Sequence, residues 1–446
     1  MTPDEARALA QQAVGVAESA GAGRAEALVV SSSSLLTRFA NNRIHQNMTW
    51  TDTGVSVRAV MGGRVGVAST NRSGEAALAS CCAAAVEAAR NSPEDPGFPG
   101  LPAPRAVTYA DRSAPGTIGY DATARAQAAG DIIGQSAARG LTAAGGISVS
   151  EQTVAVANSL GVDAAMASTS CRATVLSMGP DEGSGWASFA GRDAADLAPV
   201  SLGDQAATLA QRSACPRDLA PGDYTVVLAP DAVADIVQFL GWYGGSAKSV
   251  AEGRSYLTGH LGERIMSEAV TILDDASASW ALGLTFDFEG MPKTRVALVD
   301  RGIAGEPCTD SYWAAKTAKA NTGHALPAPN SFGPIPIDLA MAPGDATPEA
   351  LIASVERGVY VTRFHYVNIE DPVRAVLTGM TRDGTFLIED GKLTSPLRNL
   401  RFTQSAVEAL SHVGGVSTER TMVGEEGGAF APYLLLDRFA FTGQTR

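Results

Sequence analysis

The chain lacks the clusters of basic residues that a nucleic-acid-binding surface requires. Only five of its 34 basic residues are lysines, and the 446-residue chain carries a formal net charge of −13. Phosphate binding depends on clustered positive charge that displaces counterions, and no basic block occurs. We therefore expect no nucleic acid partner.

Metal-binding and disulfide patterns are missing as well. The five cysteines form no C-x-x-C, and no two of the five histidines lie within one helical turn of each other. This spacing predicts no zinc ribbon, disulfide framework or local zinc pair, so reduced thiols are expected. Nucleophile elbows, S-x-x-K motifs and Walker loops are also absent. The acidic first residues and the lack of a run of ~20 apolar residues predict a cytoplasmic protein without a membrane segment.

The first half of the chain predicts mixed helices and strands. Thr2 and Pro3 are suited to start a helix, and apolar residues follow at helical spacing as far as Ala17. Strands are expected over 25–32 and 35–40 around a serine-rich turn, over 51–61, and in a hairpin of 145–158 with 162–177. Pro221-Gly222 is the candidate hinge.

The second half predicts more strands than helices. A helix is expected over 231–240, and strands over 359–368, 373–381, 384–389 and 433–441. At ~100–200 residues per domain, the length favours two domains. We predict an α+β protein with a mixed α/β domain over residues 1–220 and a strand-rich, barrel-like domain over residues 221–446.

Polar residues alone leave the chemistry open. Asp287 and Glu289 would share one face of a strand, which suits acid/base work or a metal, but the Gly-Met-Pro that follows is typical of a turn. His324 and His365 lie in polar surroundings, where a histidine has either a structural or an acid/base role.

A series of collinear motifs resembles the TldD/PmbA family. The second half contains Ala251-Glu-Gly-Arg-Ser-Tyr-Leu-Thr-Gly-His, Phe286-Asp-Phe-Glu-Gly-Met-Pro-Lys-Thr-Arg, Leu298-Val-Asp-Arg-Gly, Thr322-Gly-His-Ala and Gly391-Lys-Leu-Thr-Ser-Pro-Leu-Arg. Upstream, Pro221-Gly-Asp-Tyr-Thr-Val-Val-Leu fits the same pattern. The resemblance covers nearly the whole chain, and its specificity comes from the order of the motifs.

The resemblance implies that this chain holds no zinc. One subunit type of the family, TldD, is a zinc metallopeptidase with H-E-x-x-x-H on the helix after the Pro-Gly-x-Tyr strand and a cysteine ligand near the C-terminus. The matching window here places Gln238, Phe239 and Tyr243 at the ligand and glutamate positions, and the window 423–428 contains no cysteine. Catalytic zinc needs about three protein ligands, which these residues do not supply. The expectation is therefore no metal, cofactor or catalytic residue in this chain, and zinc in a TldD-like partner.

Three hypotheses about function follow. The first is a non-catalytic subunit of the TldE type that forms a heterodimer with a TldD-like metallopeptidase, encloses a peptide substrate for proteolysis or peptide maturation, and is a homodimer when alone. The second is a self-sufficient enzyme without zinc, and the third is a homodimeric peptide-binding scaffold. The family's label as a modulator of DNA gyrase implies partner binding rather than chemistry. The candidate cleft residues are Gln238, Tyr243, Asp287, Glu289, His324 and His365.

Overall fold

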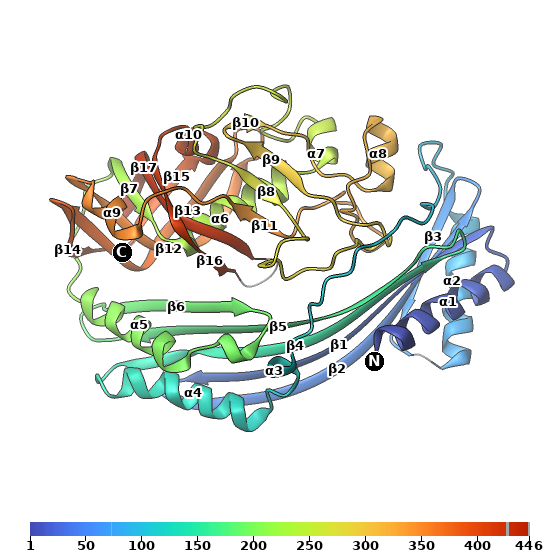
Figure 1. Ribbon diagram of the computed structural model, residues 1–446, viewed down its shortest axis with the longest axis horizontal. Coiled ribbons are helices and arrows are strands. Elements are labelled where there is room, and N and C mark those ends of the chain that lie inside the picture. Colours follow the sequence, from blue (N-terminus) through green and yellow to red (C-terminus); the bar gives the residue numbers. More distant parts are fainter. Residues whose placement is uncertain (73, 425–427, 445–446) are drawn as a thin grey trace.

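The computed structural model describes residues 1–72, 74–424 and 428–444, which form two β-sheets with helices around them (Figure 1). The predicted α+β class is confirmed. The first sheet is antiparallel with the order β3-β2-β1-β4-β5-β6. Its strands are β1 (Arg24–Ala40), β2 (Arg43–Met61), β3 (Arg64–Thr70), β4 (Thr142–Asn158), β5 (Asp163–Met178) and β6 (Ser184–Gly191).

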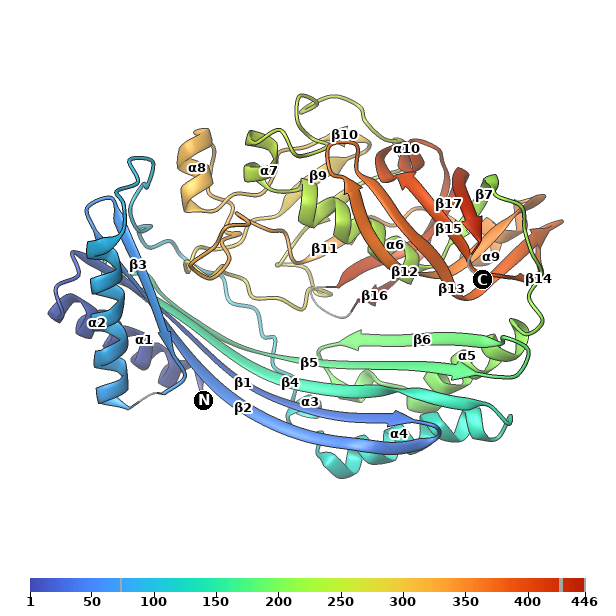
Figure 2. The same cartoon turned by 180° about the vertical axis from the view of Figure 1, so that it is seen from behind.

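Helices cover one face of this sheet, and the second half of the chain lies over the other face (Figures 1 and 2). The helical elements are α1 (Pro3–Ser19), α2 (Glu75–Asn91), α3 (Pro115–Ile118), α4 (Ala122–Ala137), η1 (Ala194–Asp196) and α5 (Pro199–Arg212). The predicted first helix is confirmed, and Thr2 with Glu5 forms a capping box at its start. Alanine-rich faces of α1 and α2 bury against one end of the sheet, and α4 and α5 bury against the other.

The predicted serine-rich turn within residues 31–34 is wrong, because β1 runs without interruption from Arg24 to Ala40. The backbone of this serine run is paired on both sides, with β2 and with β4. The chain turns at Asn41 and Asn42, which are typical turn formers and both adopt positive φ. Ser32 and Ser34 consequently point to the same face of the sheet.

The second sheet has eleven strands and a barrel-like region. The path β7-β12-β13-β15-β17 returns to its start because β17 also pairs with β7. The strands are β7 (Gly222–Leu228), β8 (Ile272–Asp274), β9 (Val296–Asp300), β10 (Ile303–Ala304), β11 (Leu339–Met341), β12 (Arg357–Asp371), β13 (Val376–Glu389), β14 (Lys392–Leu397), β15 (Leu400–Ser405), β16 (Val413–Val423) and β17 (Ala429–Gln444).

The two strands predicted over 373–381 and 384–389 are a single strand, β13. Asp383 and Gly384 have positive φ within this strand, which allows an irregular backbone to continue the pairing with β12. The prediction placed a break at residues 382 and 383, with Gly384 as the start of the next strand. The link from β12 to β13 comprises residues 372–375.

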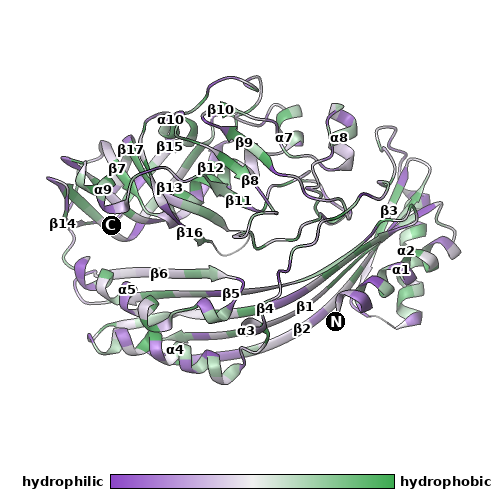
Figure 3. Cartoon of the chain, in the orientation of Figure 1, coloured by the Kyte–Doolittle hydropathy of each residue, from purple (hydrophilic) through white to green (hydrophobic). Residues whose placement is uncertain are grey.

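The largest hydrophobic core fills the second half of the molecule. The helical elements of the second half of the chain are α6 (Pro230–Phe239), η2 (Leu240–Gly244), α7 (Ala247–Ala251), α8 (Ser311–Thr317), α9 (Pro348–Ala353) and α10 (Ala406–Ser411). Helix α6 packs onto β17 and β12, and hydrophobic residues follow β8 and β9 (Figure 3). All five cysteines are free, and Cys215 alone is exposed. Within the described ranges, no helix has the length and apolar character needed to cross a membrane.

Candidate functional site

A large cleft lies between the first sheet and helix α6. Its volume is about 1180 Å³, and its walls come from β1, β4, β5 and β6 on one side and from α6, η2 and β12 on the other. This volume exceeds the ~300–1,000 Å³ of most small-molecule sites, so several residues of an extended peptide would fit. Polar and aromatic side chains in its lining include Trp186, Asp231, Asp235, Gln238, Arg363 and His365.

Helix α6 presents one face to the hydrophobic core and another to the cleft. Pro230 starts the helix, and side chains such as Val233 and Ile236 are buried in the core. Asp231, Asp235 and Gln238 follow at intervals of four and three residues and line the cleft. Such intervals place side chains on one side of a helix. The helix is thus the element that aims polar groups into the cleft.

The side-chain amide of Gln238 is buried, and its Nε2 atom has no hydrogen-bond partner among the described residues. The residue is 8% exposed, and no described residue accepts a hydrogen bond from its Nε2 atom. A buried donor left in this state costs ~1–3 kcal/mol. A ligand with an acceptor group at this point would remove that cost.

Tyr243 lies apart from the cleft. It belongs to η2, is 44% exposed, and stacks its ring on Phe239 with 5.6 Å between ring centroids. The window that resembles the zinc motif therefore supplies an amide, a phenyl ring and a phenol. None of these groups fits catalytic zinc, which binds histidine, cysteine or carboxylate ligands.

No cluster elsewhere in the described ranges takes the place of these ligands. Residues 1–72, 74–424 and 428–444 contain no group of three or more His, Cys, Asp or Glu side chains arranged to hold a metal ion. Within the second window, 423–428, Glu425, Glu426 and Gly427 lie outside the described residues.

Asp231 is held by a network that joins both halves of the molecule. It accepts hydrogen bonds from Trp186 Nε1 at 3.2 Å and from Ser188 Oγ at 3.1 Å, both on β6. The Arg363 guanidinium lies 4.1 Å from the centre of the Trp186 ring and forms an ion pair with Asp383. Burial raises the pKa of Asp231, although the two donors oppose that shift. These contacts fix one end of the cleft.

Asp235, one turn further along α6, has no such support. Neither a hydrogen bond nor an ion pair connects it to any described residue, although it lines the cleft. Burial and the nearby Asp231 raise the pKa of Asp235 to about 7, against the opposing charge of Arg363. Its carboxylate is therefore a half-buried acceptor available to a ligand.

His365, like Gln238, is a predicted site residue that lines the cleft. It lies on β12 beside Tyr366, with 5.5 Å between ring centroids. Burial and the positive charges of Arg363 and Arg382 lower the pKa of His365. The imidazole is therefore neutral at neutral pH and adds no positive charge to the cleft.

Asp287 and Glu289 lie in a turn away from the cleft. Asp287 accepts hydrogen bonds from the backbone N–H groups of Glu289, Met291 and Ala325, each at 2.9 Å. Burial and the Glu289 carboxylate raise the pKa of Asp287, whereas these donors oppose the shift. Glu289 accepts from Arg58 Nη2 at 3.2 Å, and Arg58 also pairs with Glu26. This buried network ties the turn to the first sheet.

His324 is buried in a third location. Its Nε2 lies 2.9 Å from Asp274 Oδ1, and its Nδ1 lies 2.9 Å from Thr322 Oγ1. Burial opposes ionisation of Asp274, but His324 and Lys293 together lower its pKa. The candidate acid/base groups Asp287, Glu289, His324 and His365 thus occupy three separate places.

Sequence reasoning missed Asp231, Asp235, Trp186 and Arg363. The recurrence of Asp231, Asp235 and Gln238 on one side of a predicted helix was a usable signal. By contrast, no local pattern links Trp186 or Arg363 to that helix.

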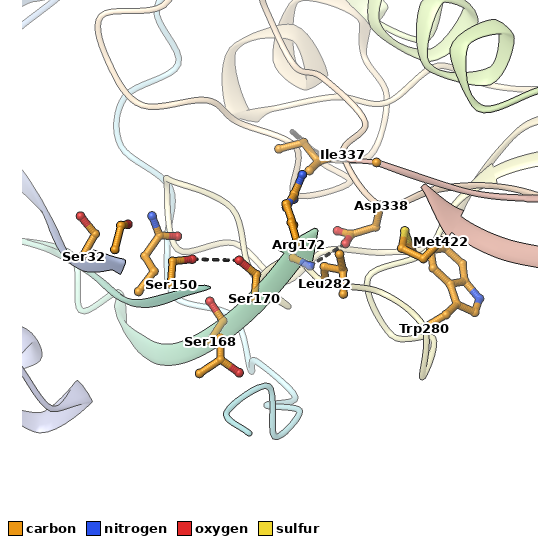
Figure 4. A pocket seen from close by; sticks show the side chains of 15 residues that line it. Ser32, Ser150, Ser168, Ser170, Arg172, Trp280, Leu282, Ile337, Asp338 and Met422 are labelled. Atoms are coloured by element: carbon orange, nitrogen blue, oxygen red, sulfur yellow. Dashed lines mark hydrogen bonds between the residues drawn. The ribbon is translucent and has the colours of Figure 1, made fainter. Parts of the chain in front are cut away.

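A smaller cavity of about 230 Å³ adjoins the cleft at Arg172, which lines both (Figure 4). Serines from β1, β4 and β5 form one wall, with Ser150 Oγ 2.8 Å from Ser170 Oγ. Asp338 lies on the other side and accepts from the Gly283 N–H at 2.8 Å. Arg172 also donates to the Gly424 carbonyl at 2.9 Å. The hydroxyl-lined wall extends the polar surface of the first sheet.

The fold and cleft define a class of two-sheet α+β proteins with a peptide-sized cavity between the sheets. Family models match most of the chain: the PmbA/TldA metallopeptidase domain 1 over residues 25–89, the central domain over 104–214 and the C-terminal domain over 221–443. The chain belongs to the TldD/PmbA family of metallopeptidase-like proteins, and the predicted resemblance is confirmed.

Relatives and solved structures agree with this assignment. The chain is 25% identical over 202 residues to a metalloprotease of Methanothermobacter thermautotrophicus, covering 44% of this chain and 43% of that protein. It is 26% identical over 243 residues to a metalloprotease TldD homologue of Haemophilus influenzae, covering 49% and 50%. The matched region thus spans about half the length of these curated relatives.

Two crystal structures share the fold across nearly the whole chain. TldE from Thermococcus kodakarensis superposes with a TM-score of 0.89 at 20% identity, covering 98% of this chain and 100% of that one. A Thermotoga maritima protein described as a modulator of a DNA gyrase superposes with a TM-score of 0.86 at 18% identity, covering 98% and 99%. At these identities the likeness establishes the fold.

Proposed function

We propose that this chain is a non-catalytic, TldE-like subunit that holds an unstructured peptide while a TldD-like zinc metallopeptidase partner cleaves it. The observation that carries the proposal is the α6 window, where Gln238, Phe239 and Tyr243 stand at the positions of the family's zinc motif. Relatives named as metalloproteases support a role in peptide cleavage.

The peptide-holding role is supported by the size and lining of the cleft. A peptide is cleaved efficiently only when its carbonyl is held in register with the metal, and one wall of a chamber can supply that orientation. The aromatic side chains Phe239 and Trp242 lie beside polar groups of α6 in the lining. This mixture suits peptide backbone together with varied side chains.

An open edge of the first sheet supports association with a second subunit. Strand β3 pairs with β2 only over residues 55–61, so the outer edge of residues 43–54 faces no neighbouring strand in the described chain. Ile44, Met48 and Trp50 in this segment are 40%, 44% and 44% exposed. Met48 and Trp50 share one face of the sheet with Leu36, which is paired with Met48 and lines the cleft. A partner seated at this edge would extend the wall of the cleft.

The self-sufficient enzyme remains the alternative from a different class. Its candidate groups are divided between the cleft, the turn at Asp287 and the buried His324–Asp274 pair. A constellation that shares one reacting atom requires groups within hydrogen-bond reach of it. This separation favours the subunit proposal.

Peptide turnover in excess chelator tests the proposal. The purified chain alone should hold no stoichiometric zinc by elemental analysis and should leave an unstructured peptide intact, because its α6 window offers no zinc ligands. Adding the chain to a zinc-loaded TldD-like subunit should create or sharpen cleavage. Cleavage by the chain alone in chelator, lost on His365→Ala, would establish the enzyme alternative. Peptide binding by a homodimer with no effect on any TldD-like partner would establish the scaffold.

A further inference from the structure

Two groups on α6 are available to a ligand and lie three residues apart. The Asp235 carboxylate has no hydrogen bond or ion pair to any described residue, and Gln238 Nε2 is buried without an acceptor among them. Side chains at this interval are neighbours on a helix surface, with ~5–6 Å between Cβ atoms. The cleft therefore offers a carboxyl group, which the positive charge of a bound ammonium would favour in its ionised form, and a neutral donor side by side.

We infer that Asp235 and Gln238 form a subsite for the N-terminal residue of a bound peptide. Asp235 pairs with the terminal ammonium group, and Gln238 donates a hydrogen bond to the carbonyl of the same residue. The inference rests on the proposed peptide-holding function for its substrate class, and it adds the end of the peptide that this subunit recognises.

The pairing of the two groups distinguishes the peptide terminus from other cations. An N-terminal ammonium lies on the same residue as a carbonyl oxygen, so both protein groups can be satisfied together. The ammonium of a lysine side chain is separated from its own carbonyl by a long aliphatic stem and would leave Gln238 unsatisfied. A metal ion is a poor fit, because the described residues supply no third acidic, histidine or cysteine ligand.

The surrounding charges permit a cation at this position. Arg363 is neutralised by its ion pair with Asp383 and stacks on Trp186. The remaining arginines of the lining, Arg38 and Arg172, belong to β1 and β5 of the first sheet rather than to α6. Phe239 and Trp242 add aromatic surface beside the two polar groups, which also favours an ammonium ion.

The test combines a protein substitution with a change in the peptide. Calorimetric titration would use the full chain with an unstructured hexapeptide of alanine, glycine and serine, amidated at its C-terminus, in free-amine and N-acetylated forms. A third peptide is acetylated but contains one lysine. The variants are Asp235→Asn and Gln238→Leu, with Glu268→Gln as a matched control, because Glu268 is exposed and lies outside the cleft.

Acetylation should weaken binding to the wild-type chain by about tenfold or more, as expected for loss of a charge-assisted hydrogen bond. The lysine peptide should bind as weakly as the acetylated one. In Asp235→Asn the penalty for acetylation should disappear, whereas Gln238→Leu should bind the free peptide more weakly and still prefer it to the acetylated form. Glu268→Gln should match the wild type.

Equal affinity of the wild-type chain for both peptides would overturn the inference, as would an unchanged acetylation penalty in Asp235→Asn or an absence of binding. The variants' circular dichroism must match that of the wild type, and Gln238→Leu provides an independent reading if Asp235→Asn fails to fold. Partner-dependent cleavage is measured separately. Cleavage that persists without terminal selectivity would reject the subsite and retain the proposed function.

Discussion

Buried carboxylates in this chain differ in whether the fold supplies them with a partner. Asp274 is paired with His324, and Glu289 is paired with Arg58. Asp235 receives no comparable partner from the described residues, and its pKa is raised to about 7. Functional sites are enriched in groups of this unsupported kind, since a ligand can complete them.

The raised pKa of Asp235 predicts a specific pH dependence of stability. Between the ordinary value near 3.8 and about 7, the folded chain binds more protons at this residue than the unfolded chain, so the free energy of unfolding falls as pH rises through this window. Asp235→Asn lacks the titrating carboxyl group, so its free energy of unfolding should not show this fall. We expect the variant to gain on the order of 1–2 kcal/mol relative to the wild type between pH ~4 and pH ~8, after allowance for solvent screening.

Urea unfolding at a series of pH values measures this difference. Glu268→Gln is the control, and its curve should run parallel to that of the wild type because Glu268 is exposed. The groups near Asp235 that also carry charge are Asp231 and Arg363, and both remain in the variant. Parallel curves for Asp235→Asn and the wild type would contradict the prediction.

The sequence predicted the helix that carries the site but only part of the site itself. Gln238 was found by comparison with the family's motif, and the helix over 231–240 corresponds to α6. Asp287 and Glu289 could be read as a strand face or a turn, because their surroundings are set by Ala325 and Arg58, which are remote in sequence. His324 likewise depends on Asp274, 50 residues away. Contacts between residues so far apart in the chain leave no pattern in the local sequence from which they could be predicted.

At the scale of single elements, the prediction was correct where capping and turn residues close in sequence determine the structure. The start of α1 follows from Thr2 and Pro3, and the hairpin predicted over 145–158 and 162–177 corresponds to β4 and β5. The prediction failed at the serines of β1, where pairing with two neighbouring strands overrides weak strand propensity. It failed again at the predicted break over residues 382 and 383, where the positive φ angles of Asp383 and Gly384 permit an irregular but continuous strand.

The contact between β3 and α2 predicts a strong effect of one added methyl group. Gly66 lies so close to α2 that a Cβ atom would come within 2.1 Å of the Ala89 nitrogen and 2.3 Å of the Ala85 carbonyl oxygen. Gly66→Ala must therefore push the helix away from the sheet. We expect a loss of at least about 2 kcal/mol in the free energy of unfolding, measured by urea titration.

Gly15→Ala is the matched control for this substitution. Gly15 lies within α1, and apart from its chain neighbours and the adjacent backbone of its own helix no atom lies within 4 Å of the position of an added Cβ. Alanine should stabilise the helix there by up to ~1 kcal/mol. Destabilisation of similar size at both positions would show that the close packing of Gly66 is not the cause.

At the scale of the whole molecule, the cleft and the open sheet edge belong to one continuous surface. The first sheet is covered by helices on one face, and its other face carries the cleft lining and the exposed segment of β2 (Figures 1 and 2). Unpaired strand edges are usually protected by lysine, proline or a bulge. Residues 43–54 contain neither lysine nor proline, and the one irregularity in their pairing with β1 lies at one end, between Ile44 and Gln46, so the edge of residues 46–54 stays regular and open to a partner.

This edge predicts how the chain assembles. We expect a homodimer in isolation and a heterodimer with a TldD-like subunit, with more than ~2,000 Å² buried in total for a permanent interface.

Changing Met48 and Trp50 together to lysine places charge on the exposed apolar face, so the chain should become monomeric by light scattering while its circular dichroism is retained. Thr49→Lys, on the opposite face of the same strand, should leave the dimer intact. A wild-type chain that stays at 45.8 kDa at every concentration, with and without a partner, would reject the assembly, and a dimer that survives both lysines would move the interface elsewhere.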